Sequence, residues 1–152
     1  MEAGPWTEAD FDRLSWHDCS VYGVAFDVDA AGGRSDLRLD IDFIVEWICG
    51  EAGRATFRIA PATLVFHHAT DARIAIEPFG SASQIALFAP QISSIARERV
   101  LDQRVCLDRP YFAWTIELAT PGGRIAFGAS GFTQTLRRAP VVSSEQQFDG
   151  PR

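Results

Sequence analysis

Four consecutive residues, Trp16, His17, Asp18 and Cys19, form the most conspicuous cluster of chemically capable side chains in this sequence. If they begin a strand, Asp18 points to one face, and His17 and Cys19 point to the other. A histidine, a cysteine and a carboxylate on one face could bind a metal ion or form a cysteine nucleophile. A neighbouring strand would have to supply the carboxylate.

The run from residue 37 to residue 48 is a candidate for that neighbour, because apolar and polar side chains alternate along it. Carboxylates on alternate residues of one strand lie about 6.6–6.8 Å apart, a separation that an inverting glycosidase would use. Every exposed strand with alternating acids has this spacing, so we expect the acidic face to be a solvated face. The apolar face comprises Leu37, Leu39, Ile41, Phe43, Val45 and Trp47, and the polar face comprises Arg38, Asp40, Asp42 and Glu46.

The glycine-rich stretch 30–34 between residues 16–28 and 37–48 predicts a β-hairpin. Centring the turn on Gly32-Gly33 places apolar residues opposite each other on one face. It also separates Cys19 from Cys49, so we expect free thiols, buried or nearly so. The predicted pairs are Phe26–Leu39, Val24–Ile41, Tyr22–Phe43, Asp27–Arg38, Asp18–Trp47, Cys19–Glu46 and Trp16–Cys49.

This register leaves two interpretations of Asp18 open. Its carboxylate could tie down a backbone turn or an indole N–H, or it could belong to a polar pocket with Trp16 and Trp47. His67 and His68 are adjacent, so they face opposite sides of a strand and indicate its polar exit rather than a metal site.

Composition places the chain among soluble globular proteins. Its 152 residues are 47% hydrophobic and 22% charged, which is typical of one domain. The net charge of −6 argues against nucleic-acid and anionic-membrane partners. All 14 basic residues are arginine, so no lysine can form a Schiff base. Three cysteines without C-x-x-C spacing argue against a disulfide framework and a structural zinc site.

Residues 1–12 lack the features of a signal peptide, and no run approaches the roughly 18 apolar residues that span a bilayer. We therefore expect a cytoplasmic protein without a cofactor.

The rest of the chain predicts a mostly β, antiparallel meander that forms a sandwich or a partly closed barrel of about seven strands. A short N-terminal helix (1–14, best defined over 5–14) precedes a β core (15–130) and a C-terminal tail (131–152), all within one domain (1–152). Thr7 and Asp10 resemble a helix capping box. Pro61 indicates a strand break or an edge position. Residues 80–90 fit either a loop or a turn of helix.

The runs SWHDCSVYGVAF, LRLDIDFIVEW, APATLVF, WTIEL and GRIAFGASGFTQ resemble a group of short bacterial proteins of unknown function. These open with W-H-D and carry an acidic strand that ends in Glu-Trp. The resemblance covers about Leu14 to Leu136 and implies no activity, cofactor or catalytic residue.

Our leading hypothesis is a non-enzymatic binding or interaction domain for a protein partner or a small apolar ligand. Small acidic bacterial proteins include toxin-neutralising immunity proteins, an analogy of size and charge. An immunity-like chain would receive a basic partner on its acidic strand face. The alternative is a small hydrolytic or metal-assisted enzyme with a pocket around His17, Asp18 and Glu46. Homodimerisation is compatible with either. The candidate binding residues are Trp16, His17, Asp18, Asp42, Glu46 and Trp47.

Overall fold

The computed structural model describes residues 4–76, 89–101, 108–120 and 122–152. The expected loop or helical turn at 80–90 and the thiol of Cys106 lie largely or wholly outside these residues. The elements are β1 (Trp6–Thr7), the 3₁₀ helix η1 (Glu8–Arg13), β2 (Ser20–Asp29), β3 (Arg34–Cys49), the 3₁₀ turn η2 (Glu51–Gly53), β4 (Ala55–His67), β5 (Thr70–Ile76), β6 (Gln91–Arg99), β7 (Phe112–Thr120), β8 (Gly123–Ala129), β9 (Gly131–Leu136) and β10 (Val141–Ser143).

The strands form one antiparallel sheet, which confirms the mostly β prediction, but the described residues contain ten strands rather than about seven. The order β1-β9-β4-β3-β2-β6-β7-β8-β5 leaves the sheet open, and β10 pairs with β4. Two of the extra strands, β1 and β10, are too short to show a period of two. In addition, β9 lies in the expected tail.

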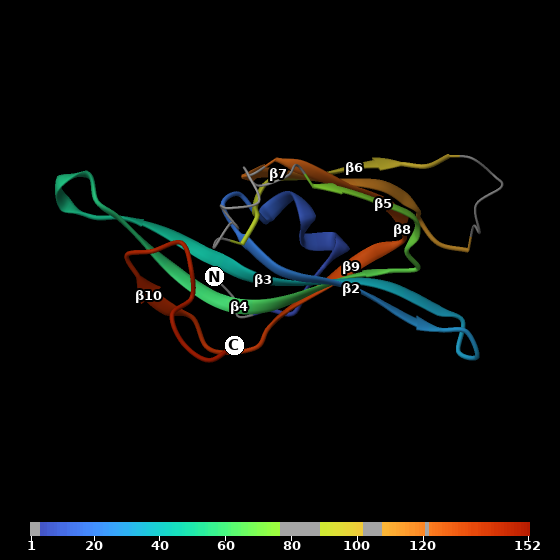
Figure 1. Cartoon of the computed structure of the whole chain (residues 1–152), viewed down its shortest axis with the longest axis horizontal. Helices are drawn as coiled ribbons and strands as arrows, with labels where there is room; N and C mark the ends of the chain where they lie inside the picture. Colours follow the sequence, from blue (N-terminus) through green and yellow to red (C-terminus); the bar gives the residue numbers. More distant parts are fainter. Residues whose placement is uncertain (1–3, 77–88, 102–107, 121) are drawn as a thin grey trace, which may run out of the picture.

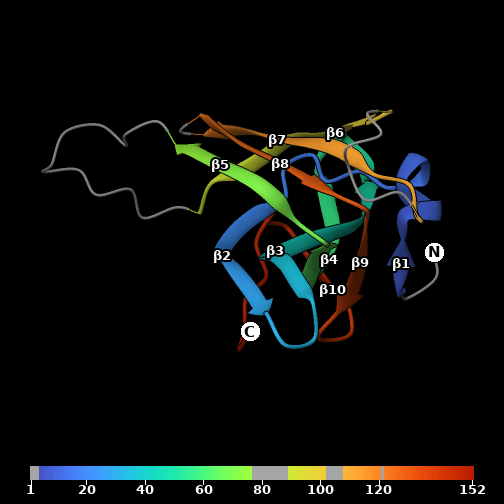
Figure 2. The same ribbon diagram turned by 90° about the vertical axis from the view of Figure 1, so that its right-hand side faces the viewer.

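A single bridge between Ser20 and Gln91 joins β2 to β6, so the sheet bends sharply there. Its two halves, β1-β9-β4-β3-β2 and β6-β7-β8-β5, face each other (Figures 1 and 2). Aromatic rings meet between them, and the Phe66 ring lies 5.0 Å from Trp114 and 4.7 Å from Phe127, centroid to centroid. Both halves therefore share one apolar core.

The expected N-terminal helix is present as the shorter η1. The Thr7 N–H donates to Asp10 Oδ2 at 2.9 Å, as the capping-box pattern predicts. Phe11 extends from η1 into the core, where its ring lies 5.7 Å from Trp16 and 5.5 Å from Trp114. Within the described residues no helix is long and apolar enough to cross a membrane.

The first hairpin forms, but its register differs from the predicted one by two residues over the outer half. Phe26 pairs with Leu37, and Val24 pairs with Leu39. The turn closes between Asp29 and Arg34, where Asp29 Oδ1 accepts a hydrogen bond of 3.0 Å from the Gly32 N–H. This side chain–backbone bond favours a longer turn than the tight one centred on the two glycines.

A shift by two residues preserves the faces of β3, so Leu37, Leu39, Ile41 and Phe43 are buried as predicted. The predicted inward face of β2 is wrong in part, because Phe26 is 56% exposed. β2 pairs with β6 only at Ser20, so nothing in the described part of the chain flanks the outer end of β2 on that side. The bulge between Val21 and Gly23 takes Tyr22 out of the predicted pairing. Asp27 contacts Arg34 at 3.2 Å instead of Arg38.

A second bulge interrupts the pairing of β3 with β4 between Ile44 and Glu46. The extra residue changes the alternation, so Val45 is buried whereas Trp47 is 46% exposed. The prediction that Trp47 shares the inward face is therefore wrong. The period of two could not reveal this bulge, because the run continues without a break in the sequence.

Pro61 does not break β4, but the edge interpretation is correct locally. Its carbonyl accepts the Arg137 N–H at 2.8 Å. The N and C=O of one strand residue point to the same side, so the missing N–H of Pro61 faces the gap between β9 and β10.

The two histidines lie at the end of β4, as predicted. His67 Nε2 lies 2.8 Å from Thr133 Oγ1, whereas His68 Nδ1 lies 2.8 Å from Ser130 Oγ.

The observed register yields a test. Leu39→Ala should lower the free energy of unfolding by about 2–5 kcal/mol, because it empties a fully buried site. Phe26→Ala should lower it by less than about 1 kcal/mol, because that ring is largely exposed. Urea denaturation followed by tryptophan fluorescence measures both. Equal losses from the two variants would support the predicted Phe26–Leu39 pair instead.

Candidate functional site

The run from Trp16 to Cys19 is a turn and not the start of a strand. The Cys19 N–H donates to the Trp16 carbonyl at 3.0 Å, and Asp18 adopts a φ of +64°. β2 begins only at Ser20. The predicted pairs of Asp18 with Trp47, Cys19 with Glu46 and Trp16 with Cys49 are therefore wrong.

Each side chain of this turn has a different environment. Trp16 is buried, and its Nε1 donates to Gln134 Oε1 at 2.7 Å. The side chain of His17 is 60% exposed, and its Nδ1 lies 3.2 Å from Asp18 Oδ1. Asp18 Oδ2 accepts a hydrogen bond of 2.9 Å from Gln146 Nε2. The carboxylate of Asp18 therefore links the turn to the C-terminal tail, and its donor is the side-chain amide of Gln146 rather than the backbone turn or indole N–H that was expected.

Cys19 is fully buried, and burial raises the pKa of its thiol to about 12, with further contributions from the negative charges of Asp18 and Asp42. A thiol with this pKa is protonated at neutral pH and is a poor nucleophile. Cys49, by contrast, is exposed, so the expectation of buried thiols is correct only for Cys19. Among the described residues, no group of three or more His, Cys, Asp or Glu could hold a metal ion.

In the described part of the chain, His17 and Glu46, which were expected around one pocket with Asp18, line two different grooves. A groove of about 390 Å³ is lined by Trp16 and His17, together with η1 and β6 residues. A groove of about 270 Å³ is lined by Glu46 and Trp47. Leu14 and Ser15 line both grooves and so separate them.

Glu46 and Trp47 also have local partners. Arg58 Nη1 donates to Glu46 Oε2 at 3.2 Å. The Trp47 ring meets Phe57 edge to face, with centroids 4.9 Å apart.

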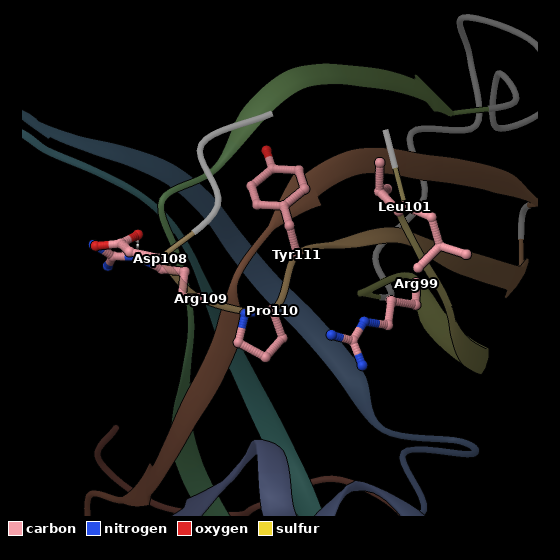
Figure 3. A pocket seen from close by; sticks show the side chains of 7 residues that line it. Arg99, Leu101, Asp108, Arg109, Pro110 and Tyr111 are labelled. Atoms are coloured by element: carbon pink, nitrogen blue, oxygen red, sulfur yellow. Dashed lines mark hydrogen bonds and ion pairs between the residues drawn. The ribbon is translucent and has the colours of Figure 1, made fainter. Parts of the chain in front are cut away.

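A further cavity of about 330 Å³ lies between the end of β6 and the start of β7 (Figure 3). The Tyr111 hydroxyl points toward β5, where it contacts the Thr70 hydroxyl. Asp108 and Arg109 pair with each other, with Nε and Oδ1 3.1 Å apart. Sequence reasoning did not single out these residues.

Asp42 contradicts the prediction of a solvated face, since its side chain is 0% exposed. The cover is the tail segment, defined here as residues 137–152, which runs across the outer side of β3 and β4, away from β6–β8 (Figures 1 and 2). The Phe148 N–H donates to Asp42 Oδ2 at 2.8 Å, and the Arg152 guanidinium contacts Asp42 Oδ1. Asp40 Oδ1 accepts from Arg152 Nη2 at 2.7 Å and also contacts Arg137.

Tyr22, at the bulge of β2, completes this arrangement. Arg152 Cζ lies 3.6 Å from the centre of the Tyr22 ring, which is a cation–π contact. Burial and, after it, the negative charge of Asp42 raise the pKa of Tyr22 to about 12. Burial alone would lower the pKa of Arg152, but hydrogen bonds to Asp40 and Asp42 outweigh it and raise that pKa.

We call Tyr22, Asp40 and Asp42 the arginine cradle. Two carboxylates and an aromatic face match the guanidinium group, which donates several hydrogen bonds in one plane and stacks on rings. The cradle binds a cation, and it is already filled by Arg152 of the same chain. Sequence reasoning identified Asp42 as a candidate but missed Tyr22 and Arg152. The only signal in the sequence was an aromatic residue, Tyr22, on the strand next to the acidic face of β3.

No family model, curated protein or solved structure matches this chain. The function therefore has to be inferred from the chemistry of the cradle and the grooves.

The burial of Cys19 has a measurable consequence. At pH 8, iodoacetamide should modify Cys49 at least about 100-fold faster than Cys19, because a thiol with a pKa near 12 contains little thiolate. Peptide mapping by mass spectrometry measures both rates. In denaturant the two rates should converge. Rapid native labelling of Cys19 would contradict its burial.

The cradle predicts an elevated tyrosine titration. The chain has two tyrosines, so Tyr111→Phe leaves only Tyr22 to report. Its absorbance at 295 nm should titrate with a midpoint near pH 12, and Asp42→Asn should lower that midpoint. Because the folded pKa lies above the ordinary value of 10.0, this group stabilises the fold below pH 10 and loses its contribution as the pH rises toward 12. A Tyr22 titration midpoint at pH 10 in the folded chain would contradict the contacts of Tyr22 with Asp42 and Arg152 in the cradle.

Proposed function

We propose that this chain is a non-enzymatic interaction domain that binds a positively charged segment of a protein partner at the acidic face of β3. The observation that carries this proposal is the arginine cradle, in which the guanidinium of Arg152 lies between Asp40, Asp42 and the ring of Tyr22. A cradle that holds one arginine has the hydrogen-bond acceptors and the aromatic face needed for another.

The burial of Asp42 supports an affinity for cations. A carboxylate that is 0% exposed is costly without a cationic or hydrogen-bonding partner. Whenever the tail segment leaves, Asp42 has to be rehydrated or paired again. A guanidinium from outside satisfies it with the same geometry and supplies a positive charge, which a neutral donor lacks.

The net charge of −6 favours the same partner chemistry, because an acidic chain attracts a basic one over long range and accelerates their association. Small acidic immunity proteins attract basic toxins by the same long-range electrostatics. The comparison with this chain is an analogy of size and charge.

The enzyme alternative has less support. His17 and Glu46 line different grooves, and Glu46 is paired with Arg58. Asp18 is held by Gln146 and His17. The three side chains of the hypothetical enzyme pocket are therefore not assembled around one reacting group.

The test uses the Arg152→Ala variant of the 152-residue chain, which removes the Arg152 guanidinium from the cradle and leaves the contact of Arg137 with Asp40 in place. The peptide acetyl-Gly-Pro-Arg-amide should bind it at least about tenfold more tightly than the same peptide with citrulline in place of arginine. Citrulline has almost the same shape but no charge. Isothermal titration calorimetry at 50 mM and 500 mM salt measures both, and the arginine peptide should weaken as salt rises.

Two further variants in the Arg152→Ala background serve as controls. Asp42→Asn should abolish the preference for arginine over citrulline. Glu117→Gln removes an acid paired with Arg124 at a distance of 2.7 Å on the other half of the sheet, and it should leave the preference unchanged. Equal binding of the two peptides to the Arg152→Ala variant would refute the proposal.

A further inference from the structure

The tail segment covers the sheet without becoming part of its interior. No residue from 137 to 152 is buried. Buried sheet residues meet this segment: Asp42, which accepts from Phe148 and Arg152, and Ile59, which pairs with Val141, are both 0% exposed. The outer face of β3 and β4 therefore presents apolar side chains beside one carboxylate, and the largely exposed tail segment covers this face.

A small number of contacts hold this segment. Three residue pairs join β10 to β4. Beyond them, the Arg137 N–H donates to the Pro61 carbonyl and the Arg137 guanidinium contacts Asp40. Gln146 donates to Asp18, the Phe148 N–H donates to Asp42, and Arg152 occupies the cradle. The Phe148 ring is half-buried and packs against the apolar core. Most of the anchoring therefore comes from charge and hydrogen bonds, which a competing segment can reproduce.

The two ends of the anchored stretch have a fixed spacing. Phe148 and Arg152 are four residues apart, and Gly150 and Pro151 lie between them. Gly150 has a φ of +146°, and a Cβ at this position would lie 3.1 Å from Cε1 of Phe148. Only glycine adopts this conformation readily, so the seated conformation depends on Gly150 as well as on Arg152.

We propose that the tail segment is an intramolecular ligand that closes the arginine cradle, and that the partner opens it with a segment carrying an aromatic residue four positions before an arginine. This inference rests on the proposed function and specifies both the partner's recognition element and the regulation of the site.

Closure in the same chain lowers the apparent affinity for any competitor. A tethered ligand acts at a high effective concentration, and the site accepts a competitor only in the fraction of molecules that are open. The intact chain should therefore bind a partner segment weakly, and any change that unseats the tail should strengthen binding by the inverse of the open fraction.

The experiment compares four full-length chains: the natural chain, Arg152→Ala, Gly150→Ala and Arg138→Ala. Arg152→Ala removes the guanidinium from the cradle, whereas Gly150→Ala keeps every charge and unseats the turn. Arg138→Ala removes an equal charge from the same segment, and the exposed Arg138 guanidinium makes no hydrogen bond or ion pair with the described part of the chain. Circular dichroism checks that each variant is folded.

The probe is the acetylated and amidated peptide of residues 144–152, SEQQFDGPR, titrated by calorimetry. It should bind Arg152→Ala and Gly150→Ala at least about tenfold more tightly than the natural chain and Arg138→Ala. A peptide with phenylalanine and aspartate exchanged, SEQQDFGPR, places the aromatic residue three positions before the arginine and should bind the opened variants at least about tenfold more weakly.

The outcomes separate this inference from the proposed function. Equal affinity of the probe for all four chains would overturn closure by the tail but leave an arginine-binding face intact. Equal affinity of the two peptides would overturn the spacing. A natural chain that is dimeric by analytical ultracentrifugation and becomes monomeric in the Arg152→Ala variant would place the tail on a second copy and overturn closure within one chain. If neither nine-residue peptide nor acetyl-Gly-Pro-Arg-amide bound to the Arg152→Ala variant, the proposed function would be overturned as well.

Discussion

The buried carboxylate of Asp42 is the constraint on which the outer half of this structure depends. It lies in the middle of β3, where the side chain opposite it on β4 is Pro61 and the one opposite it on β2 is Ser20. No neighbour on the sheet supplies a positive charge to it. The chain satisfies Asp42 from the far end of the sequence, with an N–H at residue 148 and a guanidinium at residue 152. The path of the tail segment follows from this requirement.

The inner half depends on apolar contacts instead. Phe66 from β4 meets Trp114 and Phe127 from the opposite half of the sheet, and Phe11 enters from η1. The indole of Trp16 is anchored on Gln134, which fixes the turn that precedes β2. The molecule thus has an aromatic interior that sets the fold and a polar, charge-held exterior at β3. Under the proposed function, the exterior is the part that exchanges partners while the interior keeps its packing.

Much of the fold could be predicted from the sequence, because it follows from local alternation. Leu37, Leu39, Ile41 and Phe43 fall on the inward face as their period requires, and the capping pattern at Thr7 and Asp10 is present. The bulge beside Val45 could not be predicted, since an inserted residue leaves no compositional mark in an apolar run. The bulge beside Tyr22 was missed although Gly23, an isolated glycine inside a strand, is a signal for one.

The same holds for the candidate site. Asp42 could be selected from its strand, but its partner Arg152 is 110 residues away, and a single sequence contains no signal for such a pairing. The turn at Trp16–Cys19 was missed because aspartate tolerates the left-handed conformation without any glycine to mark it.

Pro61 has a consequence for how the chain leaves the sheet. After Leu136, β9 could extend along β4 only if the next residues of β4 offered both donors and acceptors. Pro61 accepts the Arg137 N–H but has no hydrogen to give in return. The ladder therefore ends there, the backbone is released, and it resumes pairing with β4 only at β10, on the far side of the proline. Pro61, which pairs with Asp42, thus determines the path of the chain after β9. Without a donor at Pro61, the residues after Leu136 do not lengthen β9 but cross the sheet and reach the carboxylate of Asp42.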